Sequence, residues 1–130
     1  MRRLFLAFAL SVGTAPALAC GPAENIHAVM EDGQGSDSIV ASIGEVRLSE
    51  PFNIDFYDCT GILPEGADLR IDAVMPAHQH GMNYAPRVSR PEANKVSVSG
   101  MVFHMPGHWV IELAVFDGDV TRYTLEYHLK

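Results

Sequence analysis

The sequence predicts an all-β protein: an immunoglobulin-like (cupredoxin-like) antiparallel β-sandwich of about seven short strands. Two observations lead to this prediction. Several short runs alternate apolar and polar residues, which is the period of a half-buried strand. Turns rich in Gly, Pro and Asn separate these runs at regular spacing. Because no run after residue 38 has helical periodicity, two sheets packed face to face are the expected way to bury the apolar faces.

The predicted strands follow one another from residue 38 to the C-terminus. The run 51–58 alternates strictly, and Trp109 begins a similar run that is expected to reach the centre of the core. Asp117-Gly118 is a hairpin turn signal. The stretch 83–94 contains two prolines and is predicted to be a loop or an edge strand. The expected strand runs are 38–43, 51–58, 69–75, 95–99, 109–115 and 122–128.

The N-terminal residues are expected to form a cleaved signal peptide and an irregular arm. Residues 1–19 combine two arginines, a short apolar run and the small-x-small sequence Ala17-Leu18-Ala19, which is the pattern of an export signal. The segment 20–37 lacks strand periodicity and has room for one helical turn around Ile26. Residues 38–130 then make a single β-sandwich domain.

Two cysteines, Cys20 and Cys59, bear on the compartment. In an exported chain they are most simply explained as one disulfide. Closing this loop of about 40 residues would contribute on the order of 3–4 kcal/mol. Lipid attachment to Cys20, with a free Cys59, is the alternative, although the position three residues before Cys20 holds Ala17 rather than the usual Leu. A disulfide and a periplasmic location are the preferred interpretation.

The chain is acidic, with a formal net charge of −7. The segment after residue 19 is more acidic still, because the two arginines of the predicted signal lie before it. Such a surface argues against nucleic acid and anionic lipid as partners and attracts cations weakly.

Two segments, 75–82 and 101–109, contain four of the six histidines and four of the six methionines. Imidazole and thioether groups suit copper in both oxidation states, because Met favours soft Cu(I) and His binds Cu(I) and Cu(II). The sequence therefore predicts a copper site at the rim of the sandwich. The candidate ligands are His78, His80, Met82, His104, Met105 and His108.

Spacing and sequence context support a shared site. In an extended strand, side chains two residues apart lie on one face, which would align His78, His80 and Met82. The sequence 105–107 (Met-Pro-Gly) predicts a tight turn beside the other ligands. If both segments lie at the same end of the sandwich, six ligands converge, and three or four suffice for copper.

Other metals and other residues are less favoured. Met is a poor zinc ligand, and the chain has neither a Cys pair nor an H-E-x-x-H motif. A blue-copper centre needs a Cys ligand shortly before a His and a Met, which Cys59 lacks. Met75 and Met101 are candidate core residues, and Met75 is also a candidate fringe ligand. His27 and His128 are isolated in the sequence and are interpreted as structural or solvated.

The combination Met-Pro-x-His-x-His-Gly-Met, a variable loop, and Phe-x-Met-Pro-Gly-x-Trp resembles the YtkA-like and FixH-type family of small exported β-sandwich domains. The resemblance covers roughly residues 51–130 and rests on 75–82 and 103–109. It implies extracytoplasmic copper handling linked to cytochrome oxidase maturation. His78, His80, Met82 and Met105 match the family pattern, whereas His104 and His108 occupy variable positions. FixH-type proteins commonly carry a membrane anchor, and here only a cleavable signal is predicted.

The leading functional hypothesis is a periplasmic copper chaperone, carrier or buffer that is not an enzyme. Its partner would be a copper-receiving protein such as a cytochrome oxidase or another periplasmic cuproenzyme. Ligands at a rim are also compatible with a metal shared across a homodimer. The alternatives are a metal-independent immunoglobulin-like interaction module and a small copper-dependent oxidoreductase.

Overall fold

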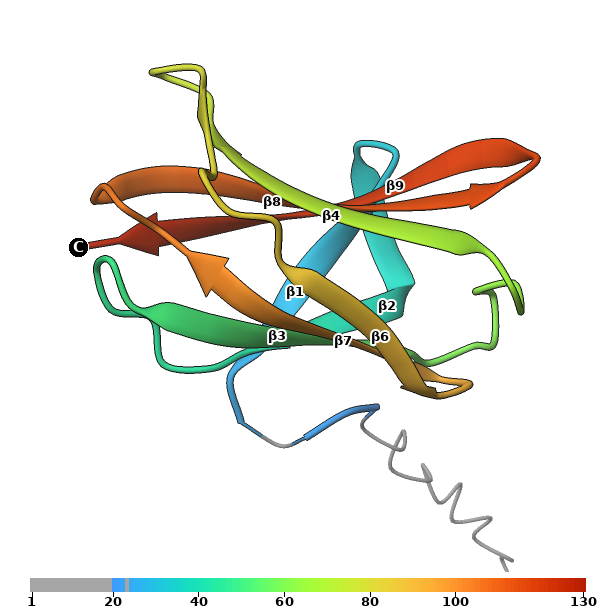
Figure 1. Cartoon of the computed structure of the whole chain (residues 1–130). Coiled ribbons are helices and arrows are strands. Elements are labelled where there is room, and N and C mark those ends of the chain that lie inside the picture. The colour runs from blue at the N-terminus through green and yellow to red at the C-terminus, as the bar shows by residue number, and fades with distance from the viewer. Residues whose placement is uncertain (1–19, 23) are drawn as a thin grey trace, which may run out of the picture.

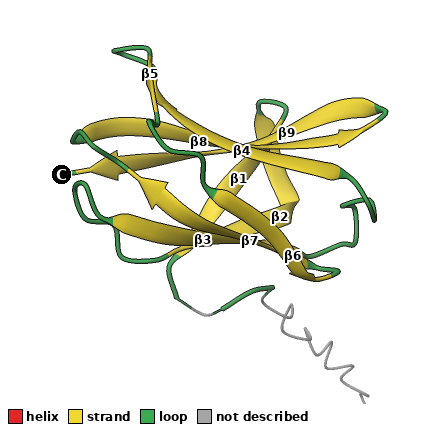
Figure 2. Ribbon diagram, in the orientation of Figure 1, coloured by secondary structure: helices red, strands yellow, loops and turns green. Residues whose placement is uncertain are grey.

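The computed structural model describes residues 20–22 and 24–130, and all regular structure in this part of the chain is β (Figure 2). The predicted signal peptide of residues 1–19 lies outside the described residues. No membrane-spanning helix occurs in the described part. The strands are β1 (Ile26–Glu31), β2 (Gln34–Ile43), β3 (Pro51–Asp58), β4 (Asp68–Met75), β5 (His80–Gly81), β6 (Arg87–Glu92), β7 (Lys95–Val102), β8 (Gly107–Asp117) and β9 (Asp119–Leu129).

The strands form one antiparallel sheet in the order β5-β4-β8-β9-β1-β2-β3-β7-β6. This sheet curls over, so that β4, β8 and β9 form one layer and β3, β7 and β6 form the facing layer (Figure 1). The predicted all-β, sandwich-like class is confirmed. The structure differs in that β1 and β2 join the two layers into a continuous sheet, and that nine strands replace the expected seven.

The irregular arm predicted for residues 20–37 is wrong, because most of it forms strands β1 and β2. Asp32 and Gly33 form the two-residue loop between these strands, and both have positive φ angles, of 46° and 85°. Asp-Gly is a strong signal for such a turn. The sequence of β1 does not alternate between apolar and polar residues, because Val29 is its one buried residue and its pairing register with β2 shifts after Ala28.

The core lies between the two layers and contains the residues that the alternation placed inward. Phe56, Phe103 and Trp109 are all fully buried, which confirms the predicted central position of Trp109. Strands β8 and β9 pair without interruption from Asp117–Asp119 to Gly107–Leu129, which confirms the predicted hairpin. Strand β6 lies at one edge of the sheet, where its proline is tolerated because the outer N–H positions need no partner.

A disulfide joins the segment before β1 to the end of β3, and a buried carboxylate holds the loop that follows β3. Cys20 and Cys59 form a disulfide, as predicted. Because lipid attachment would use the same sulfur of Cys20, the disulfide excludes it in this state. Next to Cys59, the 5 % exposed side chain of Asp58 accepts backbone hydrogen bonds of 2.8–3.2 Å from the four residues Thr60, Gly61, Ile62 and Leu63.

We expect the double variant Cys20→Ser/Cys59→Ser to lose about 3–4 kcal/mol of unfolding free energy, because the open chain gains conformational entropy in the unfolded state. Urea unfolding followed by Trp109 fluorescence measures the loss. A reducing agent should destabilise the wild type by a similar amount and leave the double variant unchanged. An equal response of both proteins to reductant would contradict the prediction.

Asp58 makes the stability of the folded protein depend on pH in the acidic range. Burial raises the pKa of the carboxyl group, but the backbone N–H donors of residues 60–63 lower it more, and the net pKa lies below the ordinary value. A lowered folded-state pKa stabilises the protein above the unfolded pKa, about 3.9. This contribution is lost as the pH falls through the folded-state pKa.

We therefore expect Asp58→Asn to destabilise the protein at pH 7 by about 2 kcal/mol, because an amide NH₂ group would face backbone donors. The variant should also lose less stability than the wild type between pH 5 and about pH 2. The control is Asp68→Asn, since Asp68 makes only an exposed ion pair with Arg70, and such pairs are worth about 0–1 kcal/mol. Parallel pH profiles for wild type and Asp58→Asn would refute this role.

Candidate functional site

The two His- and Met-containing segments meet at one end of the sandwich. Val74 near the end of β4 pairs with Val110 near the start of β8, so the β4–β5 turn, at the upper left of Figure 1, and the β7–β8 connection, at its left edge, belong to the same end of the sandwich. The meeting of the two segments, on which the predicted site depended, is therefore present in the fold. We call His78, His80, Met82, His104 and Met105 the rim cluster: ring contacts join the three histidines, and the two methionines belong to the same two segments of the sequence.

Stacked aromatic side chains support the rim cluster from below. The Phe103 ring stacks on Trp109 at 4.4 Å between centroids and meets Phe52 edge-on at 4.8 Å. The Trp109 indole N–H donates a 3.0 Å hydrogen bond to the Met105 carbonyl oxygen. His104 lies against the same indole, with its ring nearly perpendicular at 5.5 Å. The fully buried Trp109 therefore holds the backbone that carries both His104 and Met105.

The rim cluster brings together imidazoles from two separate segments. The His80 ring centroid lies 6.2 Å from that of His78 and 6.4 Å from that of His104. Met82 and Met105 are half-buried and pack against the core. Met82 also lines a groove with a volume of about 660 Å³, and none of the three rim histidines lines this groove.

The extended conformation predicted for residues 78–82 is wrong at its start. The chain turns tightly after β4: the His78 N–H donates to the Met75 carbonyl oxygen at 3.2 Å, and Gln79 has a positive φ of 52°. His78 and His80 therefore come near each other through a turn and not through the two-residue period of a strand. Of the candidate core methionines, Met75 and Met101 are both buried, with exposed fractions of 2 % and 0 %.

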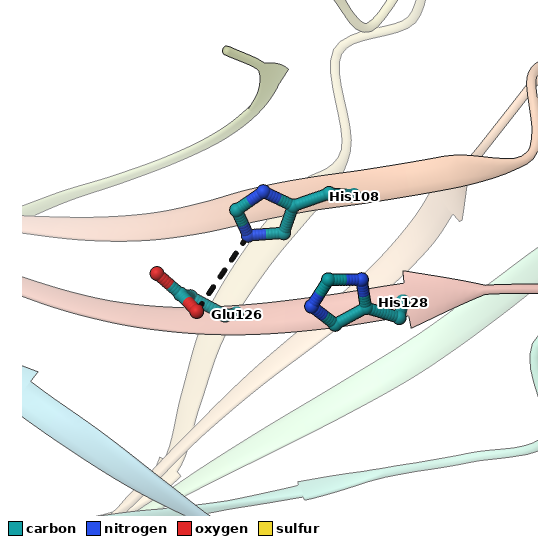
Figure 3. Close-up of side chains that lie close together, drawn as sticks. All are labelled: His108, Glu126 and His128. Atoms are coloured by element: carbon teal, nitrogen blue, oxygen red, sulfur yellow. Dashed lines mark ion pairs between the residues drawn. The ribbon is translucent and has the colours of Figure 1, made fainter. Parts of the chain in front are cut away.

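His108 joins a different group of side chains. Figure 3 shows His108 of β8 beside Glu126 and His128 of β9, and we call these three residues the hairpin cluster. The His108 and His128 rings stack at 4.6 Å with an angle of 12°, and Nε2 of His108 lies 3.7 Å from a carboxylate oxygen of Glu126. One ligand atom from each residue lies within 4.8 Å of the others.

The alternation of inward and outward side chains along β8 explains why His108 does not lie with the other predicted copper ligands. Trp109 points into the core, and neighbouring side chains of a strand point to opposite faces, so His108 points outward. The sequence contained a signal for its actual neighbour. His108 and His128 lie ten residues before and ten residues after Gly118, and an unbroken hairpin register pairs them. His128 is therefore isolated in the sequence but not in the fold.

The two clusters differ in their donor atoms. The rim cluster offers imidazole and thioether groups, which suit soft and borderline metal ions. The hairpin cluster offers two imidazoles and one carboxylate, which is a donor set of divalent ions such as Zn²⁺. Comparison of the chain with models of known families, with characterised proteins and with solved structures found no match.

Gly107 packs closely against the end of the Met75 side chain beneath the rim cluster. It has a positive φ of 128°, and a Cβ atom added to it would lie 2.8 Å from Cε of Met75. We expect Gly107→Ala to cost about 1–3 kcal/mol of unfolding free energy, from backbone strain and overpacking. The control is Gly100→Ala, where φ is also positive but no atom lies within 4 Å. Thermal unfolding of both variants measures the difference, and equal losses would show that the contact with Met75 is unimportant.

Proposed function

We propose that the protein binds copper at the rim cluster and carries or buffers it outside the cytoplasm, for delivery to a cuproenzyme such as a cytochrome oxidase. The observation that carries the proposal is the approach of His80 and His104, which come from different segments, to 6.4 Å between ring centroids. Two methionines of the same segments, Met82 and Met105, flank them in the sequence. The motifs that resemble YtkA-like and FixH-type domains point to the same function.

The ring spacing is compatible with a shared metal ion. With metal–nitrogen bonds near 2.0 Å, the centroids of two imidazoles on one ion lie about 5–6 Å apart. The distances of 6.2 Å and 6.4 Å around His80 exceed this by little. His78 and His80 lie in an exposed turn and an exposed two-residue strand, so their side chains are free to rotate toward a shared ion without disturbing the core.

The donor set would serve both oxidation states. Cu(I) would be held by the thioether of Met82 or Met105 with one or two imidazoles, whereas Cu(II) would favour the imidazoles of His78, His80 and His104. The exposed edge of the site leaves room for ligands of a partner to replace those of the protein one at a time. Transfer of copper then needs no unfolding of the sandwich.

The disulfide supports a location outside the cytoplasm. Disulfides such as Cys20–Cys59 form and persist in oxidising compartments. In the proposed role the periplasm is that compartment, and the predicted signal peptide is the route to it. The acidic surface, with a net charge of −7 over the whole chain, would attract cations to the site weakly.

We expect near-stoichiometric Cu(I) binding in a titration against a chromophoric chelator, and its loss in His80→Ala/His104→Ala, because too few ligands remain. Ascorbate is the reductant, since thiols would open Cys20–Cys59. His27→Ala is the matched control, because the His27 ring lies near Tyr127 and outside both clusters. Wild-type binding no tighter than that of the double variant would reject the copper role and favour a metal-independent interaction module.

A further inference from the structure

The hairpin cluster, on the outer face of the β8–β9 hairpin, has features of a metal site in its own right. We propose that His108, Glu126 and His128 bind a divalent metal ion of the Zn²⁺ class, at a site separate from the rim cluster. The proposal does not depend on copper binding at the rim. It rests on the hairpin register, on the distances between the ligand atoms, and on a buried nitrogen of His108.

The hairpin register places the two histidines opposite each other. Strands β8 and β9 pair continuously over their full length, with Trp109 opposite Tyr127 on the inner face and His108 opposite His128 on the outer face. A slip of one residue would expose Trp109, which is fully buried, so the core fixes the register. Cross-strand partners have Cβ atoms about 4.5–5.5 Å apart, and the fold therefore presents two imidazoles side by side.

The third ligand comes from the same face of β9. Glu126 lies two residues before His128, so both side chains point outward. Ligand atoms from all three residues lie within 4.8 Å of one another. In a tetrahedral site with bonds of about 2.0–2.1 Å, such atoms lie about 3.3 Å apart. Because the two rings are stacked nearly parallel, the exposed side chains of Glu126 and His128 would rotate toward the ion on binding.

One nitrogen of the cluster lacks a hydrogen-bond partner. Nε2 of His108 is buried and makes no hydrogen bond, and the nearest carboxylate oxygen, on Glu126, is 3.7 Å away, which is too far for one. A buried polar atom without a partner costs free energy, and such atoms in native proteins often mark an ion or water site. A cation between His108, Glu126 and His128 would satisfy this atom.

The donor set indicates the class of metal. Two imidazoles and a carboxylate are a known ligand set for Zn²⁺ that leaves a fourth position open. The cluster has no thioether or thiolate, so it does not favour Cu(I), whereas Cu²⁺ would compete for it according to the general order of affinities. A metal ion would reach the cluster from the side of Glu126 and His128, which are both exposed, whereas Nε2 of His108 is itself buried.

The hairpin and rim clusters cannot share one ion. His104 of the rim lies against the ring of Trp109, which points into the core, and His108 points to the opposite face of the same strand. The fully buried Trp109 side chain therefore lies on the rim's side of β8. Substitutions in one cluster should abolish metal binding at that cluster and leave metal binding at the other unchanged.

The test is a Zn²⁺ titration of the purified protein against a chromophoric chelator. We expect His128→Gln and Glu126→Gln each to weaken Zn²⁺ binding by at least about tenfold, since loss of a ligand costs no less than loss of its outer-shell partner. His27→Gln, a substitution of the same kind outside both clusters, should bind like the wild type. Because the two substituted residues face solvent, circular dichroism should show unchanged folding.

Two further measurements separate this site from the rim. Zn²⁺ should shift the imidazole NMR signals of His108 and His128 in the wild-type protein, and His128→Gln should keep the Cu(I) affinity of the wild type. The proposal is overturned if Zn²⁺ affinity is unchanged in His128→Gln and Glu126→Gln, or if Zn²⁺ shifts only the signals of His78, His80 and His104. Failure of Cu(I) binding alone would reject the rim site and leave this one standing.

Discussion

Burial of Trp109 is the constraint on which the organisation of this protein depends. Its ring stacks on Phe103, its indole N–H bonds to the Met105 carbonyl, and its position fixes which face of β8 is inside. A strand whose large aromatic residue is buried cannot slip by one position without exposing it. The same residue therefore sets the hairpin register, the path of the β7–β8 connection, and the direction in which His104 and His108 point.

This constraint divides the candidate ligand side chains into two chemically different groups. The rim cluster lies at the end of the sandwich, where imidazoles and thioethers come from two connections. The hairpin cluster lies on the outer face of β8 and β9, where the donors are two imidazoles and a carboxylate. Thioethers select soft ions, and carboxylates select harder ones. The two proposed sites would therefore differ in the metal ions they favour.

Several independent contacts stabilise the framework around β1 and the end of β3. The disulfide joins Cys20 to Cys59, the neighbouring Asp58 carboxylate fixes the loop that follows β3, and β1 pairs with both β2 and β9. Strand β1 thereby joins the two layers of the curled sheet. Because β9 carries His128 and Glu126, the joining of β1 to β9 also supports the strand that supplies two ligands of the hairpin cluster.

The sequence by itself determined the all-β class, the inward position of Trp109, the β8–β9 turn at Gly118 and the disulfide, because each depends on local patterning or on residue type. It also identified the two segments of the rim cluster. Tertiary structure decided the rest. Strand β1 and the first residues of β2 were missed, because Val29 is the one buried residue of β1 and the pairing of β1 with β2 contains a register shift. The pairing of His108 with His128 depends on register over ten residues of each strand, which is fixed only when the whole core is assembled.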